Sequence, residues 1–317
     1  MEINIFFNIL LLIILFFVLN WSADFTVKNI KYLGVILKIR LFAFGILLGL
    51  ITSLPEFFLG ISATIDRAAA LSVGNLLGGV IVILGFILGS ILFLNKKIIT
   101  DGKFSSLIPI ALVIFSPILL GADGVYNFFD GLIMILLYVG LVFYLYYQNR
   151  FDHYPDSNKV KIINRSMTSK AIFFAILGMI GILISSNWIV EITLGLLNHV
   201  QVSKLVIGLV VFSIGTNLPE ISIAVTSWRK NTAELSLSHL LSTSFTNTLI
   251  LGILSILNPI VFKAGLPFWT TALFLGMTLI FLVVFYRSKK KLDSREGVIL
   301  LTMYFLFTII NIYLGFL

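Results

Sequence analysis

The side chains best suited to chemistry in this chain are two glutamates, each directly after a proline inside an apolar stretch. Residues 52–56 read Thr-Ser-Leu-Pro-Glu, and residues 216–220 read Thr-Asn-Leu-Pro-Glu, 164 positions further along. We expect Glu56 and Glu220 to be the acidic residues that lie deep in apolar spans. A carboxylate at mid-membrane depth costs at least ~2.5–3.5 kcal/mol on insertion scales, so it needs a cation, a proton or a water-filled cavity.

Proline supplies the second part of this chemistry. Pro55 and Pro219 carry no N–H, so the carbonyls of Ile51 and Gly215 lose their helical partners. Neutral oxygens lie within one turn of these breaks: the hydroxyls of Thr52, Ser53 and Thr216 and the amide oxygen of Asn217. Hard cations such as Ca²⁺ prefer carboxylate and neutral oxygen ligands. The two motifs therefore predict a metal-cation site around the two glutamates, whose two charges would neutralise one divalent ion.

The composition indicates a membrane protein. Of the 317 residues, 59% are hydrophobic and only 11% are charged, whereas soluble domains carry roughly a quarter charged residues. The absence of cysteine excludes disulfides, thiolate metal sites and cysteine nucleophiles. The net charge of +8 lies in short loops, which indicates membrane orientation and not nucleic-acid binding. We expect an integral multi-pass protein in contact with lipid, with no covalent cofactor, and the sequence identifies no protein partner.

Apolar spans of membrane-crossing length recur along the whole chain. They fall at 4–21, 33–64, 69–94, 105–121, 127–147, 170–189, 204–227, 233–257, 266–286 and 297–316. This pattern predicts an all-α, polytopic membrane protein with ten transmembrane helices. The longest polar stretch separates five helices from five, so we predict a first half at 1–147, a cytoplasmic linker at 148–169 and a second half at 170–317.

The basic residues predict the orientation. If the N-terminus is outside, 19 of the 22 Lys and Arg residues fall on the inner side, and only Arg67, Lys204 and Lys263 fall outside. The positive-inside rule then places both termini outside. The two motif helices would run in opposite directions, so the two five-helix halves are predicted to be inverted repeats. In secondary transporters with such repeats, interrupted helices meet at the bilayer midplane.

A second pair of short segments follows the two motifs. About twenty residues after each glutamate, residues 74–78 read Gly-Asn-Leu-Leu-Gly and residues 238–242 read Ser-His-Leu-Leu-Ser. Together with the Pro-Glu motifs, these segments resemble the alpha repeats of the cation/calcium antiporter superfamily, whose best-known branch is the sodium/calcium exchangers. The resemblance implies a secondary antiporter that exchanges a divalent cation, Ca²⁺, for Na⁺ at a midplane site.

The resemblance also implies roles for individual residues. Those that would hold Ca²⁺ are Glu56, Glu220, Thr52 and Thr216, and those that would help to bind sodium are Ser53, Asn217, Thr243 and Asn247. In the family, both repeats carry a serine and, four residues later, an amide or acid. Here Thr243 and Asn247 retain that polar pair, but Gly79 and Ile83 replace it in the first copy. Either one sodium site is missing or the counter-ion differs.

Other functions stay open at this point. A proton could replace sodium, because protonation also neutralises a buried carboxylate, and potassium is a further candidate counter-ion. His239 could carry a proton near Glu220 or simply pack in the membrane interior. A degenerate, non-transporting ion-binding protein is another alternative. An intramembrane enzyme is not expected, because the chain offers one membrane histidine and no convincing nucleophile–base–acid triad.

Overall fold

The computed structural model describes most of the chain. The described residues are 5–36, 49–95, 97–99, 104–148, 165–197, 202–221, 233–289 and 291–316. The last part of the span predicted to begin at 204, and most of the predicted 148–169 linker, lie outside these ranges.

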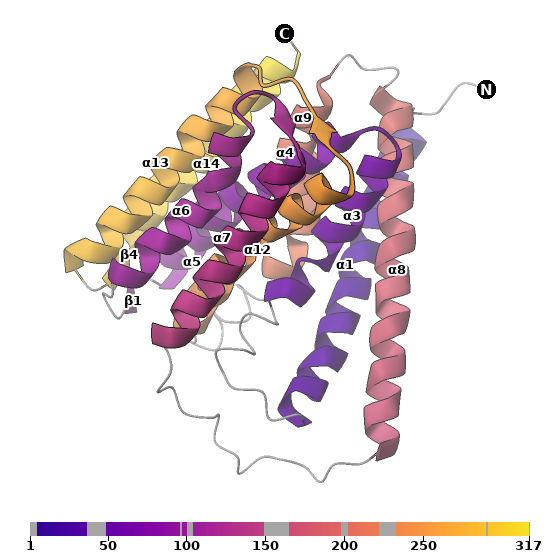
Figure 1. Ribbon diagram of the computed structural model, residues 1–317, viewed down its shortest axis with the longest axis horizontal. Helices are drawn as coiled ribbons and strands as arrows, with labels where there is room; N and C mark the ends of the chain where they lie inside the picture. The colour runs from indigo at the N-terminus through magenta and orange to yellow at the C-terminus, as the bar shows by residue number, and fades with distance from the viewer. Residues whose placement is uncertain are drawn as a thin grey trace.

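The described chain is almost entirely helical (Figure 1). Seven helical spans are long and apolar enough to cross a membrane. They are formed by α1 (Ile5–Ile36), the continuous run of α4 (Ala69–Ile81), η1 (Val82–Ile87) and α5 (Leu88–Asn95), α7 (Phe128–Gln148), α8 (Arg165–Leu197), α12 (Ala233–Leu257), α13 (Leu266–Lys289) and α14 (Ser294–Gly315).

Three shorter apolar helices complete the described set. They are α3 (Leu54–Ile65), α6 (Phe104–Leu120) and the run of α9 (Lys204–Ile207), η3 (Gly208–Phe212) and α10 (Ser213–Thr216). The protein is an integral multi-pass membrane protein, as its composition indicates. The count of ten crossings and the inversion of the two halves remain predictions.

Three of the predicted helix ends are wrong, one in α1 and two in α8. The first span was expected to end at residue 21, but α1 continues through Asp24 and Lys28 to Ile36. Similarly, α8 begins at Arg165 and ends at Leu197, beyond the expected 170–189 on both sides. A helix does not stop where its apolar stretch stops, because polar side chains leave the backbone ladder intact. Here the two helices also pack against each other.

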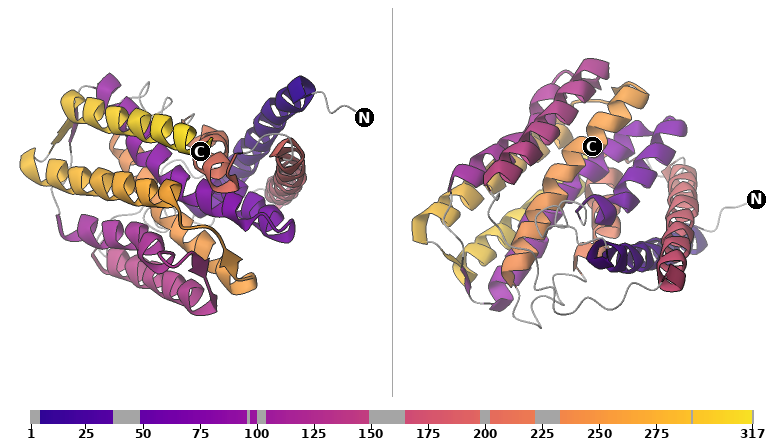
Figure 2. Two further views of the ribbon diagram at one scale, coloured as in Figure 1. Left: turned by 90° about the horizontal axis from the view of Figure 1, so that it is seen from above. Right: turned by 60° about the horizontal axis from the view of Figure 1, so that its bottom comes forward.

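The helices form a central group with a pair on either side. Figure 1 shows α1 and α8 side by side at one edge, α13 and α14 at the opposite edge, and α3, α4 and α12 between them, and the views in Figure 2 agree. Within an 18-residue apolar stretch of the spans at 69–94 and 239–257, 83% and 78% of the residues are buried, whereas no other long span exceeds 39%. The two helices that follow the motifs therefore form the interior of the protein.

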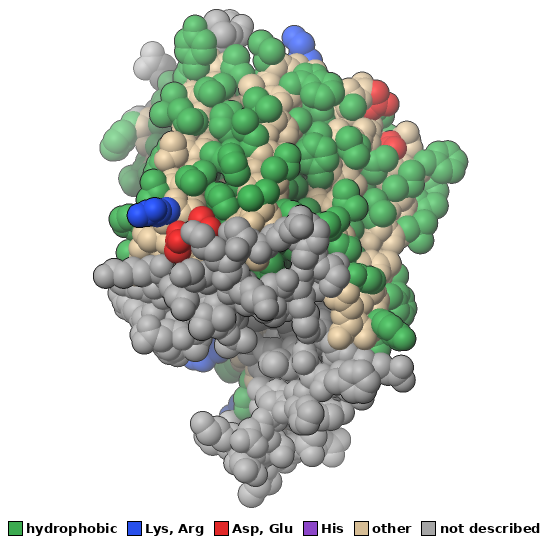
Figure 3. Space-filling model, turned by 90° about the vertical axis from the view of Figure 1, so that its left-hand side faces the viewer, with side chains coloured by type: hydrophobic (Ala, Val, Ile, Leu, Met, Phe, Trp, Pro, Cys, Tyr) green, Lys and Arg blue, Asp and Glu red, His purple; other side chains and the backbone are tan. Residues whose placement is uncertain are grey.

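The outer helices present apolar side chains to the surroundings. Phe143 on α7 is 69% exposed and Phe173 on α8 is 62% exposed. Figure 3 shows one broad face covered by hydrophobic side chains, with charged groups near its upper and lower borders. A contiguous apolar surface of this size is unusual on a soluble monomer and is suited to lipid.

Two short antiparallel strand pairs connect loops at the two ends of the molecule. Strand β1 (Lys97–Ile99) pairs with β4 (Lys291–Asp293), and β2 (Val125–Tyr126) pairs with β3 (Ile260–Val261). Each pair joins two loops that the charge count assigns to the same side of the membrane. In Figure 1, the start of α1 and the end of α14 also lie at the same end, opposite β1 and β4. Which end faces the cytoplasm remains a prediction.

Candidate functional site

Both Pro-Glu motifs lie at interruptions of a helix. The helical turn at residues 49–52 breaks at Ser53, and α3 begins at Leu54 with proline in its first turn. In the second motif, α10 ends at Thr216, the chain turns at Asn217 and helical structure resumes at residue 218. Proline is tolerated in a first helical turn but not in a helix interior, so the breaks fall where the sequence predicts them.

One of the carbonyls released by proline has a partner that sequence reasoning missed. The side-chain Nδ2 of Asn20, on α1, donates a hydrogen bond of 2.9 Å to the carbonyl oxygen of Gly215. We expected a bound cation to satisfy such groups, but at Gly215 a buried amide does so. No local signal in the sequence points to Asn20, because its partner lies 195 residues away.

The two glutamates meet in the interior of the protein. Glu56 is 1% exposed and Glu220 is fully buried. They lie close enough for their charges to repel each other, and each faces a threonine of the opposite motif: Thr216 interacts with Glu56, and Thr52 with Glu220. Nevertheless, none of the four carboxylate oxygens accepts a hydrogen bond of ordinary geometry from the described residues. Two adjacent buried carboxylates without donors call for a cation or a proton.

The six neutral residues predicted for the site are all buried with the glutamates. Their donor groups are directed to backbone carbonyls or to a neighbouring amide. The bonds are Thr52 Oγ1 to Gly49 O (3.2 Å), Ser53 Oγ to Gly49 O (2.9 Å), Thr216 Oγ1 to Asn75 Oδ1 (3.1 Å), Asn217 Nδ2 to Ser213 O (2.8 Å), Thr243 Oγ1 to His239 O (3.1 Å) and Asn247 Nδ2 to Leu76 O (3.1 Å). With their protons engaged, the oxygens keep lone pairs for another ligand.

The amide oxygens show the consequence most clearly. The Oδ1 atoms of Asn217 and Asn247 are buried and accept no hydrogen bond from the described part of the chain. Buried polar atoms are normally satisfied, so these two unpartnered oxygens need an explanation. A cation bound at either oxygen would satisfy it.

Backbone contacts between α4 and η3 bring the two motif regions together. A side chain at Gly74 would collide with the backbone of Leu205 and Gly208, and one at Gly208 would collide with the backbone of Leu71 and Asn75. Glycine at both positions allows this close approach of the two helices. The same contact positions Asn75 to accept the bond from Thr216, and the Gly-Asn segment was the sequence signal for it.

A further acidic residue was missed. Asp24 lies on α1 and interacts electrostatically with Glu220. Its side chain is exposed, unlike those of the two glutamates. We expected only Glu56 and Glu220 within the apolar spans because the first helix was predicted to end before Asp24. The physical reason for the error is the continuation of α1 through its polar turns.

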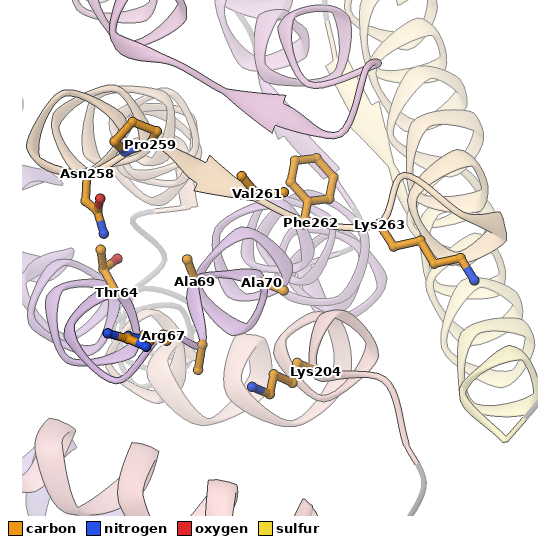
Figure 4. Close-up of a pocket in the computed structure, with 11 residues that line it drawn as sticks. Thr64, Arg67, Ala69, Ala70, Lys204, Asn258, Pro259, Val261, Phe262 and Lys263 are labelled. Atoms are coloured by element: carbon orange, nitrogen blue, oxygen red, sulfur yellow. The ribbon is translucent and has the colours of Figure 1, made fainter.

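The site is not a conventional cluster of acidic and imidazole ligands. Among the described residues, no group of three or more His, Cys, Asp or Glu side chains could hold a metal ion. A separate pocket of about 430 Å³ lies at the α3–α4 turn and the β3 loop (Figure 4). Arg67, Lys204 and Lys263 line it, with Lys263 directed away from the others in the view. This basic pocket does not suit a cation, and neither glutamate lines it.

The comparisons with known proteins agree with the geometry. The sodium/calcium exchanger protein family matches residues 7–147 and 170–313. The sodium/calcium exchanger MaX1 of Methanosarcina acetivorans is 26% identical over 97% of this chain and 99% of its own length. The uncharacterized membrane protein MJ0091 of Methanocaldococcus jannaschii is 23% identical over 62% of this chain, and the match spans 63% of that relative's length.

A solved structure shares the fold. The sodium-calcium exchanger NCX_Mj, soaked with Na⁺ and Sr²⁺, aligns with a TM-score of 0.65 at 21% sequence identity, over 96% of this chain and 98% of that one. At this identity the likeness concerns the fold alone. The match of the family over both halves of the sequence confirms the resemblance drawn from the Pro-Glu motifs. The chain belongs to the sodium/calcium exchanger protein family.

Proposed function

We propose that this protein is a secondary antiporter that exchanges a divalent cation, Ca²⁺, for sodium through a midplane site built around Glu56 and Glu220. The observation that carries the proposal is the meeting of these two buried carboxylates, whose oxygens accept no hydrogen bond of ordinary geometry from the described residues. Two negative charges compensate one divalent ion, so the loaded site approaches electroneutrality in a medium of low dielectric constant.

The neutral ligands support a hard cation. Asn217 and Asn247 offer bare amide oxygens, and Thr52 and Thr216 present hydroxyls to the carboxylates. Together with the glutamates, they form an all-oxygen ligand set of the kind that Ca²⁺ prefers. The name of the relative MaX1, and the Na⁺ and Ca²⁺ soaked into crystals of NCX_Mj, support the same pair of substrates.

Transport would proceed by alternating access. The resemblance to the cation/calcium antiporter superfamily implies that the first and sixth helices slide during transport. These helices correspond here to α1 and α8. Their contact contains small and polar residues: Gly178 and Gly181 of α8 pack closely against Ser22 and Thr26 of α1. Because Asn20 also donates a hydrogen bond to the broken helix of the second motif, a shift of α1 would also displace this part of the site.

A flux assay in proteoliposomes tests the proposal. Vesicles loaded with Ca²⁺ are exposed in turn to gradients of Na⁺, K⁺ and H⁺ at fixed voltage, and we expect an opposing Na⁺ gradient to drive Ca²⁺ efflux. The Glu56→Gln protein serves as the control with no exchange. If only a proton or a potassium gradient drove Ca²⁺ efflux, that ion and not sodium would be the counter-ion. Ca²⁺ binding without any flux would identify a non-transporting ion-binding protein.

The proton-coupled exchanger is the second candidate, and a specific observation favours it. The first motif region carries no oxygen ligand on its side chains at Gly79 and Ile83, and Ile83 is fully buried among apolar residues. A site with fewer oxygens binds fewer sodium ions, whereas a proton needs only a carboxylate. The relative response to Na⁺ and H⁺ gradients in the same assay separates the two candidates.

A further inference from the structure

The space beside Gly79 is occupied by two amide groups. A Cβ atom added at Gly79 would lie 3.1 Å from Asn217 Nδ2 and 3.1 Å from Asn247 Nδ2. These are the nearest atoms from outside its own helix turn, and both belong to the second motif region. The missing side chain at position 79 is therefore not an empty volume, because the amides of Asn217 and Asn247 converge on it.

Hydrogen bonds fix the orientation of both amides. Asn217 faces the carbonyl oxygen of Ser213, and Asn247 faces that of Leu76. A carbonyl oxygen can only accept, so the group directed to it must be the amide NH₂ and not the amide oxygen. The NH₂ groups are thus directed to the neighbourhood of Gly79, and both Oδ1 atoms are left without a partner.

The corresponding positions in the other motif region carry different side chains. At the offset of 164 positions, Gly79 corresponds to Thr243 and Asn217 corresponds to Ser53. One cross-pair thus combines glycine with asparagine, and the other combines threonine with serine. The larger side chain in the first cross-pair is accompanied by the smallest possible partner, as close packing in an interior of fixed volume requires.

We propose that Gly79 and Asn217 are a size-matched pair that sets the ion selectivity of the site, because glycine makes room for amides whose oxygens bind the divalent ion and whose NH₂ groups exclude sodium beside residue 79. This inference rests on the proposed function of the same site. The N–H groups present the positive ends of their dipoles, and a cation there would meet repulsion and not a ligand.

The glycine at position 79 of the first motif region need not impair binding of the divalent ion. The oxygen lost at position 79 is replaced by the amide oxygen of Asn217, which comes from the opposite side of the site. What is lost is a second place for a monovalent cation. We therefore infer that sodium competes with Ca²⁺ at fewer positions than in a site with hydroxyls on both sides.

A swap of the two side chains tests the pair. Purified full-length protein in detergent is titrated with Ca²⁺, and Na⁺ is then used to displace it. The variants are Gly79→Ser, Asn217→Ser, the double variant with both changes, and Gly79→Ala combined with Asn217→Ser. Gly140→Ser is the matched control, since Gly140 is exposed on α7 and an added Cβ meets nothing within 4 Å.

The expected result is strong non-additivity. Each single variant should bind Ca²⁺ roughly tenfold more weakly, because Gly79→Ser pushes the amides from their bonds and Asn217→Ser removes an oxygen ligand. The double serine variant should recover to within about threefold of the wild type, and its Hill coefficient for Na⁺ displacement should rise by about one, as for one more interacting site. The variant with alanine at position 79 should not show the steeper Na⁺ curve, because it lacks the hydroxyl.

Contrary outcomes are equally distinct. The proposal for Gly79 and Asn217 would be wrong if the losses of Ca²⁺ affinity in the two single variants multiplied in the double variant. It would also be wrong if the Hill coefficient for Na⁺ displacement did not change. The double serine variant keeps this test valid even if Gly79→Ser alone does not fold. The variants are compared by Ca²⁺ binding and not by transport. If the wild type binds Ca²⁺ but does not transport it in vesicles, the proposed antiporter function is rejected, but the binding data still test the proposal for Gly79 and Asn217. Normal flux with multiplying effects would reject the pair alone.

Discussion

The two motif regions share a backbone but differ in their side chains. In residues 49–83, and in the described residues 213–221 and 233–247, a helix breaks before a Pro-Glu pair and a buried helix follows. After the second motif, that buried helix carries a run of polar side chains, Ser242, Thr243, Ser244, Thr246 and Asn247. After the first, the corresponding positions are Gly78, Gly79, Val80, Val82 and Ile83.

This difference separates the features that both motif regions share, the helix breaks and the glutamates, from the neutral side chains, which vary between them. Each region contains one broken helix and one buried glutamate, so the two regions contribute equally to the negative charge of the proposed site. The two unpartnered amide oxygens come from one side, because Asn217 and Asn247 both belong to the second region. Two similar Pro-Glu motifs are therefore followed by different neutral side chains, and we propose that ion selectivity can change at these positions without loss of the fold.

The largest expected effect concerns the shared glutamates. Glu56→Gln and Glu220→Gln should each abolish Ca²⁺ flux in proteoliposomes, because a dication is then only half neutralised in a low-dielectric site. Both proteins should remain folded in the membrane, as checked by size-exclusion chromatography in detergent. Glu191→Gln, at an exposed position of α8, is the matched control and should transport normally. Near-normal flux in both site variants would refute the proposed site.

A second all-or-none prediction addresses the inversion of the two halves. The 19-to-3 distribution of basic residues predicts that the 148–169 linker and the Arg67 turn lie on opposite sides of the membrane. Single cysteines introduced at Asn158, which is outside the described residues, and at Arg67 should react with an impermeant reagent from opposite sides. The natural chain has no cysteine, so it serves as the unlabelled control. Labelling from one side only would remove the inverted-repeat basis of the comparison.

A smaller effect is expected at the contact between α1 and the second motif. Asn20→Ala would leave the Gly215 carbonyl buried and unsatisfied, which costs about 1–3 kcal/mol of stability. Asn29→Ala is a close control, because the Asn29 amide donates to the carbonyl of Phe25 on its own helix. Thermal unfolding in detergent should therefore show a clearly lower Tm for the first variant than for the second. Equal shifts would mean that the bond to Gly215 has no special weight.

The parts of this protein that could be predicted from sequence are those with a large energetic signature. Glu56 and Glu220 stand out because a carboxylate in an apolar span is costly, and Pro55 and Pro219 locate the helix breaks because proline cannot donate a hydrogen bond. The continuation of α1 through Asp24 has no such signature, since a polar turn fits a helix as well as a loop. Asn20 could not be found, because a single asparagine does not reveal a partner that is remote in sequence.

The smallest effect tests the asymmetry itself. Asn247 and Ile83 occupy corresponding positions, and Asn247 carries a buried oxygen with no partner among the described residues, whereas the Ile83 side chain carries no oxygen. Asn247→Ala should therefore impair coupling to the counter-ion. Ile83→Val should leave transport almost unchanged, because it removes one buried methylene and costs only about 0.5–1.5 kcal/mol of stability.

Ca²⁺ efflux from loaded vesicles at fixed voltage gives the measurement, driven first by external Na⁺ and then by an inward proton gradient. With ligands mainly on one side, we expect a shallow dependence on sodium and a measurable response to protons in the wild type. A steeply sigmoidal sodium activation with no proton effect would contradict this expectation, because it requires several cooperating sodium positions. The oxygens missing at Gly79 and Ile83 would then have to be supplied by other residues, and the two motif regions would be functionally equivalent despite their different side chains.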